Sequence, residues 1–265
     1  MKKISIVLIA AFIAFSCNEK KETAKTFTDW SADNLKGEIQ KNVESPYKVD
    51  STGKMGDMDS CCIDVIEYDS TGNIKKVISK DSKGNISREQ TFTKYENGLF
   101  KEIVTTEKGK VTNRVSIQTD NNGKYTTAQE YDSTGKLSSF YKDIHQNEYH
   151  QLTSMKQYKP DSTLKSSFET KYDKQIFEGQ INKDSSGKEV SKSSAMVDDK
   201  GNQIEFTVTN TMKDSTTKKD STTTKVTKYK YDSFDDKGNW TQRTEMDEKG
   251  KSTKIVKREI TYYKK

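Results

Sequence analysis

A short turn motif recurs along most of this chain and constrains its fold more than any other feature. The motif has Asp at its first position, Gly at its fourth, and Asn or Lys at its fifth, and it occurs nine times between Asp50 and Lys251. An Asp in this place accepts a backbone N–H and favours a type I turn. The Gly supplies the left-handed conformation that closes such a hairpin. With two shorter versions included, the predicted turn glycines are Gly53, Gly72, Gly84, Gly98, Gly109, Gly123, Gly135, Gly187, Gly201, Gly238 and Gly250.

The turns are evenly spaced, so the segments between them have the length of strands. From Gly72 to Gly135 the turn glycines lie 11 to 14 residues apart, which leaves about seven to nine residues for each strand. Apolar residues alternate with polar ones, as at Ile204, Phe206 and Val208, which is typical of an antiparallel sheet. We therefore predict an all-β fold of about 14 strands. It is an elongated antiparallel sheet of successive hairpins that either stays open or curls on itself.

Three stretches need separate predictions. Between residues 147 and 175 the turns lack Gly, but the rhythm persists and we expect strands there too. The low-complexity stretch Lys213–Lys225 leaves a long protruding hairpin and a disordered tip both open. At the start of the body we expect the first strand around Leu35–Ile39.

The chain is poor in the aliphatic residues that fill a protein core. Leu, Ile, Val and Phe together make up 47 of its 265 residues. This argues against a thick globular core and against a deep catalytic cavity. The hydrophilic composition also excludes a protein with several membrane-spanning helices. The sequence contains no Gly-x-Ser-x-Gly, His-Glu-x-x-His or P-loop signature, so we expect no enzyme.

The first 16 residues have the layout of an export signal. Two lysines precede an apolar run from Ile4 to Phe15 that is too short to span a bilayer. Ser16-Cys17 follows the run, and the sequence from Ala14 to Cys17 resembles a bacterial lipobox. The resemblance implies cleavage before Cys17 and acylation of this cysteine with palmitate-type chains. An ordinary secretory signal with a chance cysteine is the alternative.

Three segments follow from this interpretation. Residues 1–16 are the lipoprotein signal peptide, residues 17–30 are the lipidated cysteine and a flexible tether, and residues 31–265 are the β-hairpin domain. Several acyl chains hold a protein on a membrane almost permanently. Asn18, in place of an Asp after the cysteine, favours the outer membrane of the cell envelope. A periplasmic and a surface-facing position are both open.

The charge balance indicates which partners to expect. Without residues 1–16 the chain has 44 basic and 40 acidic residues, a net charge of +4. Only four of the basic residues are arginines, the side chain that suits phosphate best. Both facts exclude an electrostatic nucleic-acid binder. Broad faces of Thr, Lys and Tyr instead suit envelope glycans or proteins, and the N-terminal lipid is the expected membrane contact.

Tyrosine precedes the turn aspartate at Tyr68-Asp69, Tyr131-Asp132 and Tyr231-Asp232. This recurrence resembles YD repeats, the β-hairpin units of RHS-type proteins. The stretch from Asp236 to Tyr263 resembles the close of RHS-repeat-like lipoproteins of Bacteroidota, and the whole resemblance spans residues 33–265. It implies a fold, and a fold alone does not fix a function. Large RHS proteins wrap such hairpins around a toxin domain. This chain is much shorter than those shells and no passenger domain follows Lys265, so we expect no toxin function.

Four sulfur-containing residues form a candidate chemical site. Met55, Met58, Cys61 and Cys62 lie in the pattern Met-x-x-Met-x-x-Cys-Cys, and soft sulfur ligands of this kind can hold Cu(I). A redox role for the adjacent cysteines is a second hypothesis. Plain packing, or a structural disulfide between neighbours, is the interpretation that we favour. We therefore expect no metal and no other cofactor.

Other polar patterns fit ordinary surface roles. His145 and His150 match no zinc signature and are expected to be exposed. The turns lack the alternating acids of a calcium loop. Asp-Ser-Thr resembles an O-glycosylation signal of Bacteroidota envelope proteins, although Ser and Thr also suit turns. It occurs six times, beginning at Asp50, Asp69, Asp132, Asp161, Asp214 and Asp220.

Together these features predict a function class. The chain is expected to be an envelope-anchored bacterial lipoprotein, a non-enzymatic binding or scaffold module built of YD-like hairpin repeats. The alternative is a periplasmic metal-binding or redox accessory protein that uses the Cys61-Cys62 pair. Substitution of both cysteines separates the two, because a binding module should tolerate it.

Overall fold

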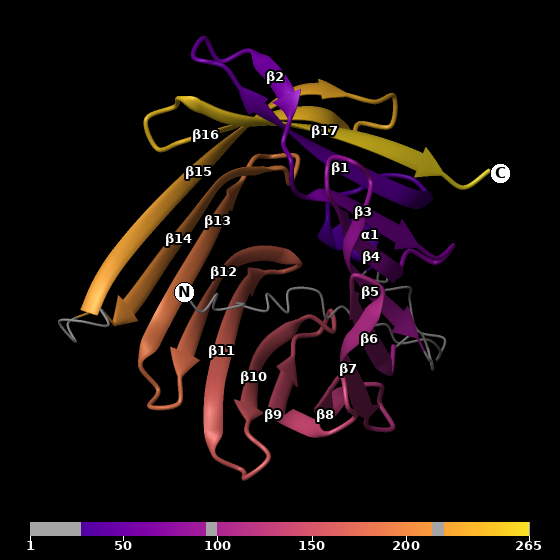
Figure 1. Cartoon of the computed structure of the whole chain (residues 1–265), viewed down its shortest axis with the longest axis vertical. Helices are drawn as coiled ribbons and strands as arrows, with labels where there is room; N and C mark the ends of the chain where they lie inside the picture. Colours follow the sequence, from indigo (N-terminus) through magenta and orange to yellow (C-terminus); the bar gives the residue numbers. More distant parts are fainter. Residues whose placement is uncertain (1–27, 94–99, 214–219, 265) are drawn as a thin grey trace.

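The computed structural model describes residues 28–93, 100–213 and 220–264. This part of the chain forms one short helix, α1 (Asp29–Ala32), and 17 strands in a single antiparallel sheet (Figure 1). The strands are β1 (Ile39–Val49), β2 (Met55–Met58), β3 (Ile63–Tyr68), β4 (Ile74–Lys80), β5 (Ile86–Thr93), β6 (Glu102–Glu107), β7 (Lys110–Thr119), β8 (Tyr125–Asp132), β9 (Leu137–Gln146), β10 (Leu152–Tyr158), β11 (Leu164–Asp173), β12 (Ile176–Asp184), β13 (Glu189–Val197), β14 (Gln203–Lys213), β15 (Asp220–Phe234), β16 (Trp240–Met246) and β17 (Ser252–Tyr262).

The hairpins form for the local reason that the sequence indicates. In the turn between β3 and β4, Asp69 Oδ1 accepts the N–H groups of Thr71 and Asn73, each at 2.9 Å. The N–H of Gly72 bonds back to the Asp69 carbonyl at 3.1 Å, with φ of +93°. Ten of the eleven predicted turn glycines have positive φ, and Gly98 lies outside the described residues. Local chemistry therefore reverses the chain at each of these turns.

The degenerate middle of the repeat keeps the same turn geometry without glycine. Two turns run from Asn147 to Gln151 and from Lys159 to Thr163, and both have the backbone bonds of the glycine-containing turns. His150 and Ser162 occupy the fourth position with φ of +61° and +68°. The second turn begins at Lys159, two residues before the Asp161-Ser-Thr sequence. Strands β10, β11 and β12 are present in this region.

The sheet closes on itself into a complete ring, which neither the open nor the curled sheet of the prediction includes. All strands except β2 form a ring of 16, because β1 pairs antiparallel with both β17 and β3. Glu44 of β1 lies opposite Arg258 of β17 on one side and Asp64 of β3 on the other. In Figure 1 the strands progress around the ring from β1 back to β17. The predicted all-β antiparallel class is confirmed, and the elongated open sheet is wrong: the protein is a closed barrel.

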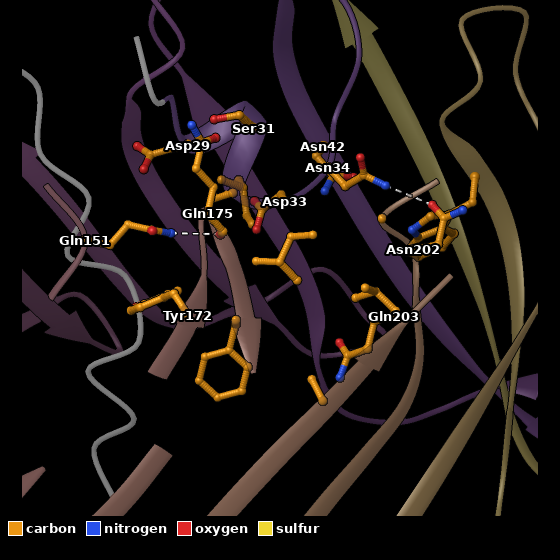
Figure 2. A pocket seen from close by; sticks show the side chains of 18 of the residues that line it. Asp29, Ser31, Asp33, Asn34, Asn42, Gln151, Tyr172, Gln175, Asn202 and Gln203 are labelled. Carbon is orange, nitrogen blue, oxygen red and sulfur yellow. Dashed lines mark hydrogen bonds between the residues drawn. The ribbon is translucent and has the colours of Figure 1, made fainter. Parts of the chain in front are cut away.

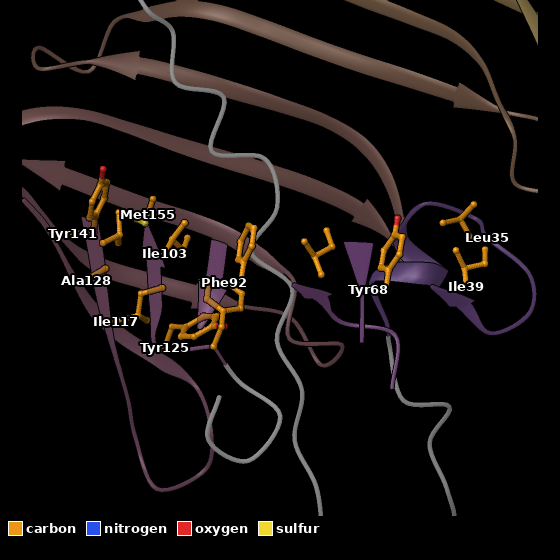
Figure 3. Close-up of a cluster of buried hydrophobic side chains, with 13 residues drawn as sticks. Leu35, Ile39, Tyr68, Phe92, Ile103, Ile117, Tyr125, Ala128, Tyr141 and Met155 are labelled. Atoms are coloured by element: carbon orange, nitrogen blue, oxygen red, sulfur yellow. The ribbon is translucent and has the colours of Figure 1, made fainter. Parts of the chain in front are cut away.

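Closure also explains how so few aliphatic residues make a core. A closed sheet encloses one of its faces, so only every second residue of a strand needs to be apolar. The buried cluster occupies the interior beside β3 to β10 and extends from Leu35, Ile39 and Tyr68 near α1 to Ala128 and Tyr141 (Figure 3). Phe92, Phe100 and Tyr125 pack ring against ring in its middle. The composition argued against a thick globular core, and the core that forms is this apolar cluster along part of the barrel interior.

Two further predictions of local structure need correction. Of the segment expected to hold the first strand, Leu35–Ile39, residues 35–38 connect α1 to β1 and only Ile39 belongs to the strand, as its first residue. Asp29 and Trp30 of the predicted tether belong to α1. The low-complexity stretch is a hairpin in which β14 and β15 pair as far as Lys213 and Asp220. Its predicted tip, residues 214–219, lies outside the described residues, as do residues 1–27. In the part of the chain that the structure describes, no helix is long and apolar enough to cross a membrane.

Candidate functional site

A short N-terminal segment, Thr28–Glu38, crosses one end of the barrel; we call it the α1 segment. Thr28 caps α1, since its hydroxyl accepts the N–H of Ser31 at 3.1 Å. Asn34 Nδ2 donates to the Lys200 carbonyl and to Asn202 Oδ1, both at 3.0 Å. These bonds join the α1 segment to the turn between β13 and β14, which are separated from β1 by β15, β16 and β17 in the ring.

The α1 segment is also bonded to the turn between β15 and β16. The N–H of Lys36 donates to Asn239 Oδ1 at 2.7 Å, and Asn239 Nδ2 donates back to the Lys36 carbonyl at 2.9 Å. Trp30 lies over Gly72 in the turn between β3 and β4. The segment is therefore held by turns from three hairpins and covers part of this end, which we call the α1 end.

The residue at the fifth position of the turn motif differs between the two ends of the barrel. At the α1 end this position holds three buried asparagines that are 2–7% exposed: Asn73, Asn202 and Asn239. Asn202 and Asn239 are the two that bond to the α1 segment. Lysines dominate the opposite end: Lys54, Lys136, Lys188 and Lys251. Asn85 at the opposite end and Lys124 at the α1 end depart from the rule. The sequence contains this alternation of Asn and Lys, but only the closed ring shows which turns lie at the same end of the barrel.

Beneath the α1 segment lies a cavity of about 610 Å³ (Figure 2). Its walls come from α1, from β1, β3 and β4, and from β10 to β17. The low aliphatic content argued against a deep catalytic cavity, but the closed sheet encloses a lumen, and a cavity of this size lies within it. The apolar cluster fills most of the interior beside β3 to β10, so most of the cavity lining comes from the α1 segment, β1 and β11 to β17.

An ion-pair cluster forms one wall of the cavity. Arg258 donates to Glu44 Oε1 through Nη2 at 2.6 Å and Nε at 3.1 Å. Arg243 Nη2 lies 3.8 Å from Glu44 Oε2 and 3.3 Å from Glu245 Oε1. Burial opposes ionisation of Glu44, but the charges of Arg258 and Arg243 outweigh it, so its pKa is lowered.

Aromatic rings surround this ion-pair cluster. The guanidinium of Arg258 lies 3.6 Å from the ring centre of Trp240, and that of Arg243 lies 4.6 Å from it. The ring of Tyr231 is 5.9 Å from that of Trp240. A second aromatic group on β11 and β12 contains Phe168, Tyr172 and Phe177, and the last two meet edge to face at 6.2 Å.

Two carboxyl groups of the α1 segment line the cavity from above. Asp29 is 6% exposed and accepts the N–H of Ile74 at 2.5 Å, and burial raises its pKa to about 8. Asp33 accepts the hydroxyl of Tyr68 at 3.0 Å. Its side chain borders the cavity yet is surrounded by protein, and this desolvation raises its pKa despite the charge of Arg258.

Amide side chains supply most of the remaining polar lining, and Figure 2 shows them on both sides of the cavity. Gln151 donates to the Gln175 carbonyl at 2.9 Å, which joins two turns at the rim. Asn42 is 1% exposed, and its Oδ1 has no hydrogen-bond partner within the described ranges. The lining amides are Asn34, Asn42, Gln151, Gln175, Gln180, Asn202 and Gln203.

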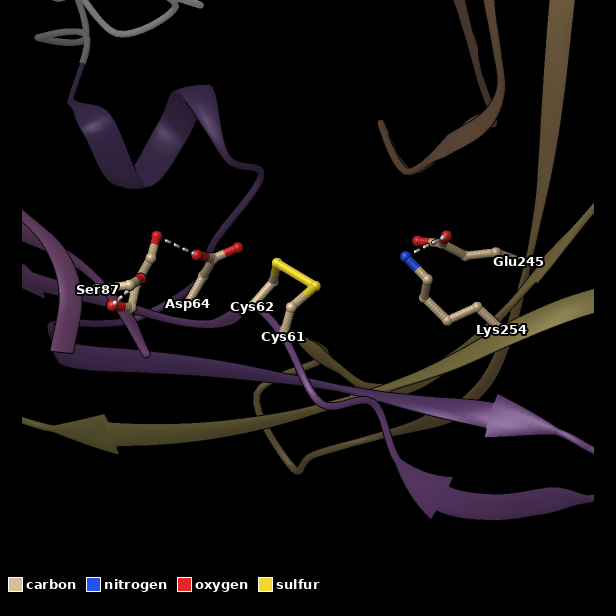
Figure 4. Close-up of a disulfide and its surroundings, with 7 residues drawn as sticks. Cys61, Cys62, Asp64, Ser87, Glu245 and Lys254 are labelled. Atoms are coloured by element: carbon tan, nitrogen blue, oxygen red, sulfur yellow. Dashed lines mark hydrogen bonds and ion pairs between the residues drawn. A yellow bond between two sulfur atoms is a disulfide. The ribbon is translucent and has the colours of Figure 1, made fainter. Parts of the chain in front are cut away.

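The predicted sulfur site lies away from the cavity, at the end opposite α1. Cys61 and Cys62 form a vicinal disulfide between β2 and β3, and both are exposed. Figure 4 shows it between Asp64 and the Glu245–Lys254 pair. Met55 and Met58 are at the two ends of β2. The disulfide occupies both thiols, which leaves no thiolate to join the methionines in binding Cu(I) while the bond is intact.

Other predicted residues have ordinary positions. Cys17 lies outside the described residues. His145 is exposed on β9, whereas His150 is half-buried in a turn, where burial and the charge of Lys124 lower its pKa. Among the residues that the structure describes, no group of three or more His, Cys, Asp or Glu side chains is placed to hold a metal ion.

The sequence predictions missed the cavity residues. Only four arginines occur in a chain rich in lysine, and two of them, Arg243 and Arg258, point into the lumen beside Trp240. Arg258 shares the parity of the buried Val256 on β17, and this was the available signal. Arg243 does not share the parity of Trp240, the buried residue of β16. The signal could not be interpreted before the inward face of each strand was known.

Comparison with known proteins supports the fold. No family model and no curated protein matches the chain. Among solved structures it is similar to a porin-like protein from Bacteroides uniformis, with 14% sequence identity, a TM-score of 0.52, and coverage of 85% of this chain and 98% of that one. A porin-like protein from Bacteroides vulgatus has 10% identity, a TM-score of 0.33, and coverage of 85% and 98%. At this identity the first likeness shows a fold alone, and the YD-repeat resemblance stays a prediction.

Proposed function

We propose that this protein is an envelope-anchored lipoprotein that binds a small ligand inside its barrel and performs no catalysis. The observation that carries the proposal is the cavity of about 610 Å³ beneath the α1 segment. It has the size of typical small-molecule sites and combines aromatic walls with a few fixed polar groups. Such a site selects and retains a ligand, which fits a binding module better than a purely structural scaffold.

The outer face of the barrel supports anchoring by lipid at Cys17. Charged pairs occupy outward positions within the strands, such as Lys76–Glu89 at 3.1 Å and Lys183–Glu169 at 2.7 Å. A lysine that faces the middle of a bilayer costs about 2–4 kcal/mol. These side chains therefore suit water, and the proposal assigns membrane attachment to the N-terminal acyl chains. The same reasoning argues against carrying a pore function over from the porin-like neighbour.

The position of the α1 segment gives the proposed anchor a direction. Ten residues separate Cys17 from Thr28, and ten residues span at most about 35 Å when extended. A lipid at Cys17 would hold the α1 end, where the cavity lies, on the membrane side of the barrel. The opposite end, with the disulfide, would face away.

Two variants of β13 test ligand binding in the lumen. Ala195 lines the cavity, whereas its neighbour Ser194 is exposed on the outer face. The mature protein is purified from its own envelope, and small molecules released from it are identified by mass spectrometry. We expect Ala195→Phe to abolish co-purification and Ser194→Phe to leave it intact. A small molecule retained equally by both variants, or none in the unmodified protein, would contradict lumen binding.

Anchoring is tested separately at Cys17. Mass spectrometry of the mature N-terminus should show an acylated cysteine, and Cys17→Ala should release the protein from the membrane fraction. An unmodified N-terminus on a membrane-bound protein would contradict the proposed anchor.

A redox accessory role remains a second candidate, because the Cys61–Cys62 disulfide is exposed. Exposure allows exchange with a partner thiol. The double variant Cys61→Ser with Cys62→Ser discriminates between the candidates. If the protein is a binding module, we expect this variant to retain the co-purifying ligand and to be as stable as the unmodified protein. Loss of a thiol-dependent phenotype in cells with ligand retention unchanged would favour the redox role.

A further inference from the structure

We infer that the ligand of the cavity is an uncharged carbohydrate, held by amide side chains and aromatic faces beneath the α1 segment. This inference rests on the proposed function and names its ligand class. It comes from comparing what the walls offer with what a charged, an apolar and a hydroxyl-rich ligand would each require.

The charges of the wall are already compensated within it. Arg258 is bonded twice to Glu44, and Arg243 lies between Glu44 and Glu245. Asp33 has the hydroxyl of Tyr68 and the charge of Arg258. A charged ligand would have to displace one of these partners and leave it buried without a counter-ion, which is costly. The wall therefore favours a ligand without net charge.

An apolar ligand fits the polar lining poorly. Seven amide side chains line the cavity, and several of them, such as Asn34 and Gln151, are bonded within the wall. Covering an amide group that has no such bond costs about 1–3 kcal/mol. Asn42 presents an acceptor, Oδ1, that has no partner in the described part of the protein. Gln203 also lines the cavity, beside the β13–β14 turn (Figure 2). A lipid tail would cover these groups without satisfying them.

A carbohydrate satisfies both kinds of wall. An amide offers a donor and an acceptor side by side, and a sugar hydroxyl can meet either. The faces of aromatic rings are electron-rich and attract the weakly positive C–H groups of a sugar ring. Phe168, Tyr172 and Phe177 are half-buried and provide such rings on β11 and β12. The pairing of amides with ring faces selects a ligand that has both hydroxyl and C–H surfaces.

The chain offers an internal reporter for the test. Of its two tryptophans, Trp240 lines the cavity, whereas Trp30 packs over the Gly72 turn. The mature protein is screened against an array of neutral and acidic glycans, and hits are titrated by tryptophan fluorescence and calorimetry. Oleate and inorganic phosphate are titrated as apolar and anionic probes.

We expect neutral glycans to bind and to change the emission of the protein but not of Trp240→Phe. Ala195→Phe should weaken binding at least tenfold, with Ser194→Phe unchanged. Gln203→Leu should weaken glycan binding about tenfold, because a hydroxyl loses its amide partner. Circular dichroism of each variant establishes that the barrel is intact, and calorimetry retains the readout where fluorescence is altered.

The outcomes separate the ligand class from the proposed function. Binding of oleate or phosphate that Ala195→Phe abolishes, with no neutral glycan bound, would overturn the carbohydrate inference and keep the lumen site. A preference for acidic over neutral glycans would also overturn it. If no probe binds and Ala195→Phe loses no co-purifying molecule, both the carbohydrate inference and the proposed binding function are overturned.

Discussion

Glu44→Gln should destabilise the barrel strongly, because Glu44 joins the two arginines of the lumen across the closing strands. The change keeps the shape of the side chain and removes its charge. Arg258 is then left 7% exposed without its ionic partner, with the second arginine also facing the site. Loss of one member of a buried pair costs about 3–5 kcal/mol. Glu44 is itself 24% exposed, so we expect the lower end of this range, about 3 kcal/mol.

Thermal unfolding followed by circular dichroism measures this effect. A loss of about 3 kcal/mol lowers the Tm of a domain of this size by about 6–12 °C. Glu169→Gln is the matched control, since Glu169 pairs with Lys183 on the outer face and is 59% exposed. An exposed pair contributes at most about 1 kcal/mol. Equal shifts in the two variants would refute the argument that the cavity wall stabilises ring closure.

The pH dependence gives an independent check of the same residue. The lowered pKa of Glu44 means that its contribution is present above the unfolded pKa, about 4.3, and is lost as the pH falls through the folded pKa. The difference in stability between the wild type and Glu44→Gln should therefore shrink in acid. A difference that stays constant down to the acid unfolding transition would show that the charge is not responsible.

Three further predictions concern the α1 segment. Asn239→Ala should lower the free energy of unfolding by about 1–3 kcal/mol, because the N–H and the carbonyl of Lys36 lose their partner. Hydrogen exchange of the Lys36 amide should accelerate in this variant but not in the control Asn85→Ala, whose side chain is exposed. Unchanged exchange would contradict the role of Asn239 in docking the α1 segment. Gly72→Ala and Gly135→Ala both force an alanine into positive φ, which costs about 1–2 kcal/mol. Only at Gly72 would the added Cβ also lie 2.8 Å from the Trp30 ring. Denaturant titration should therefore show the larger loss of stability for Gly72→Ala, and equal losses would mean that α1 does not pack on this turn. Burial raises the pKa of Asp29 to about 8, so the wild type should lose stability as the pH rises from about 4 towards that value. Asp29→Asn should flatten this pH dependence in urea melts taken at successive pH values. The same pH dependence in both proteins would refute the role of Asp29.

The arrangement of this protein divides into a local part and a global part. Turn positions, strand direction and the alternation of faces are local properties. Asp69 and Gly72 reverse the chain through bonds within five residues, so the all-β class could be predicted from the sequence. Even where Gly is missing, the rhythm of the strands kept the prediction correct, because His150 and Ser162 adopt the same left-handed backbone.

Closure of the ring and the content of its lumen depend on contacts that no local pattern contains. Glu44 meets Arg258 across 214 residues of sequence, and Asn34 meets Asn202 across 168. A hairpin repeat fixes only the pairing of neighbours, and an open sheet satisfies that pairing equally well at every strand except the first and last. Pairing of β1 with β17 removes those two edges and turns one face of every strand inward. That step made the core, the cavity and the buried ion pairs, so only the tertiary structure could identify them.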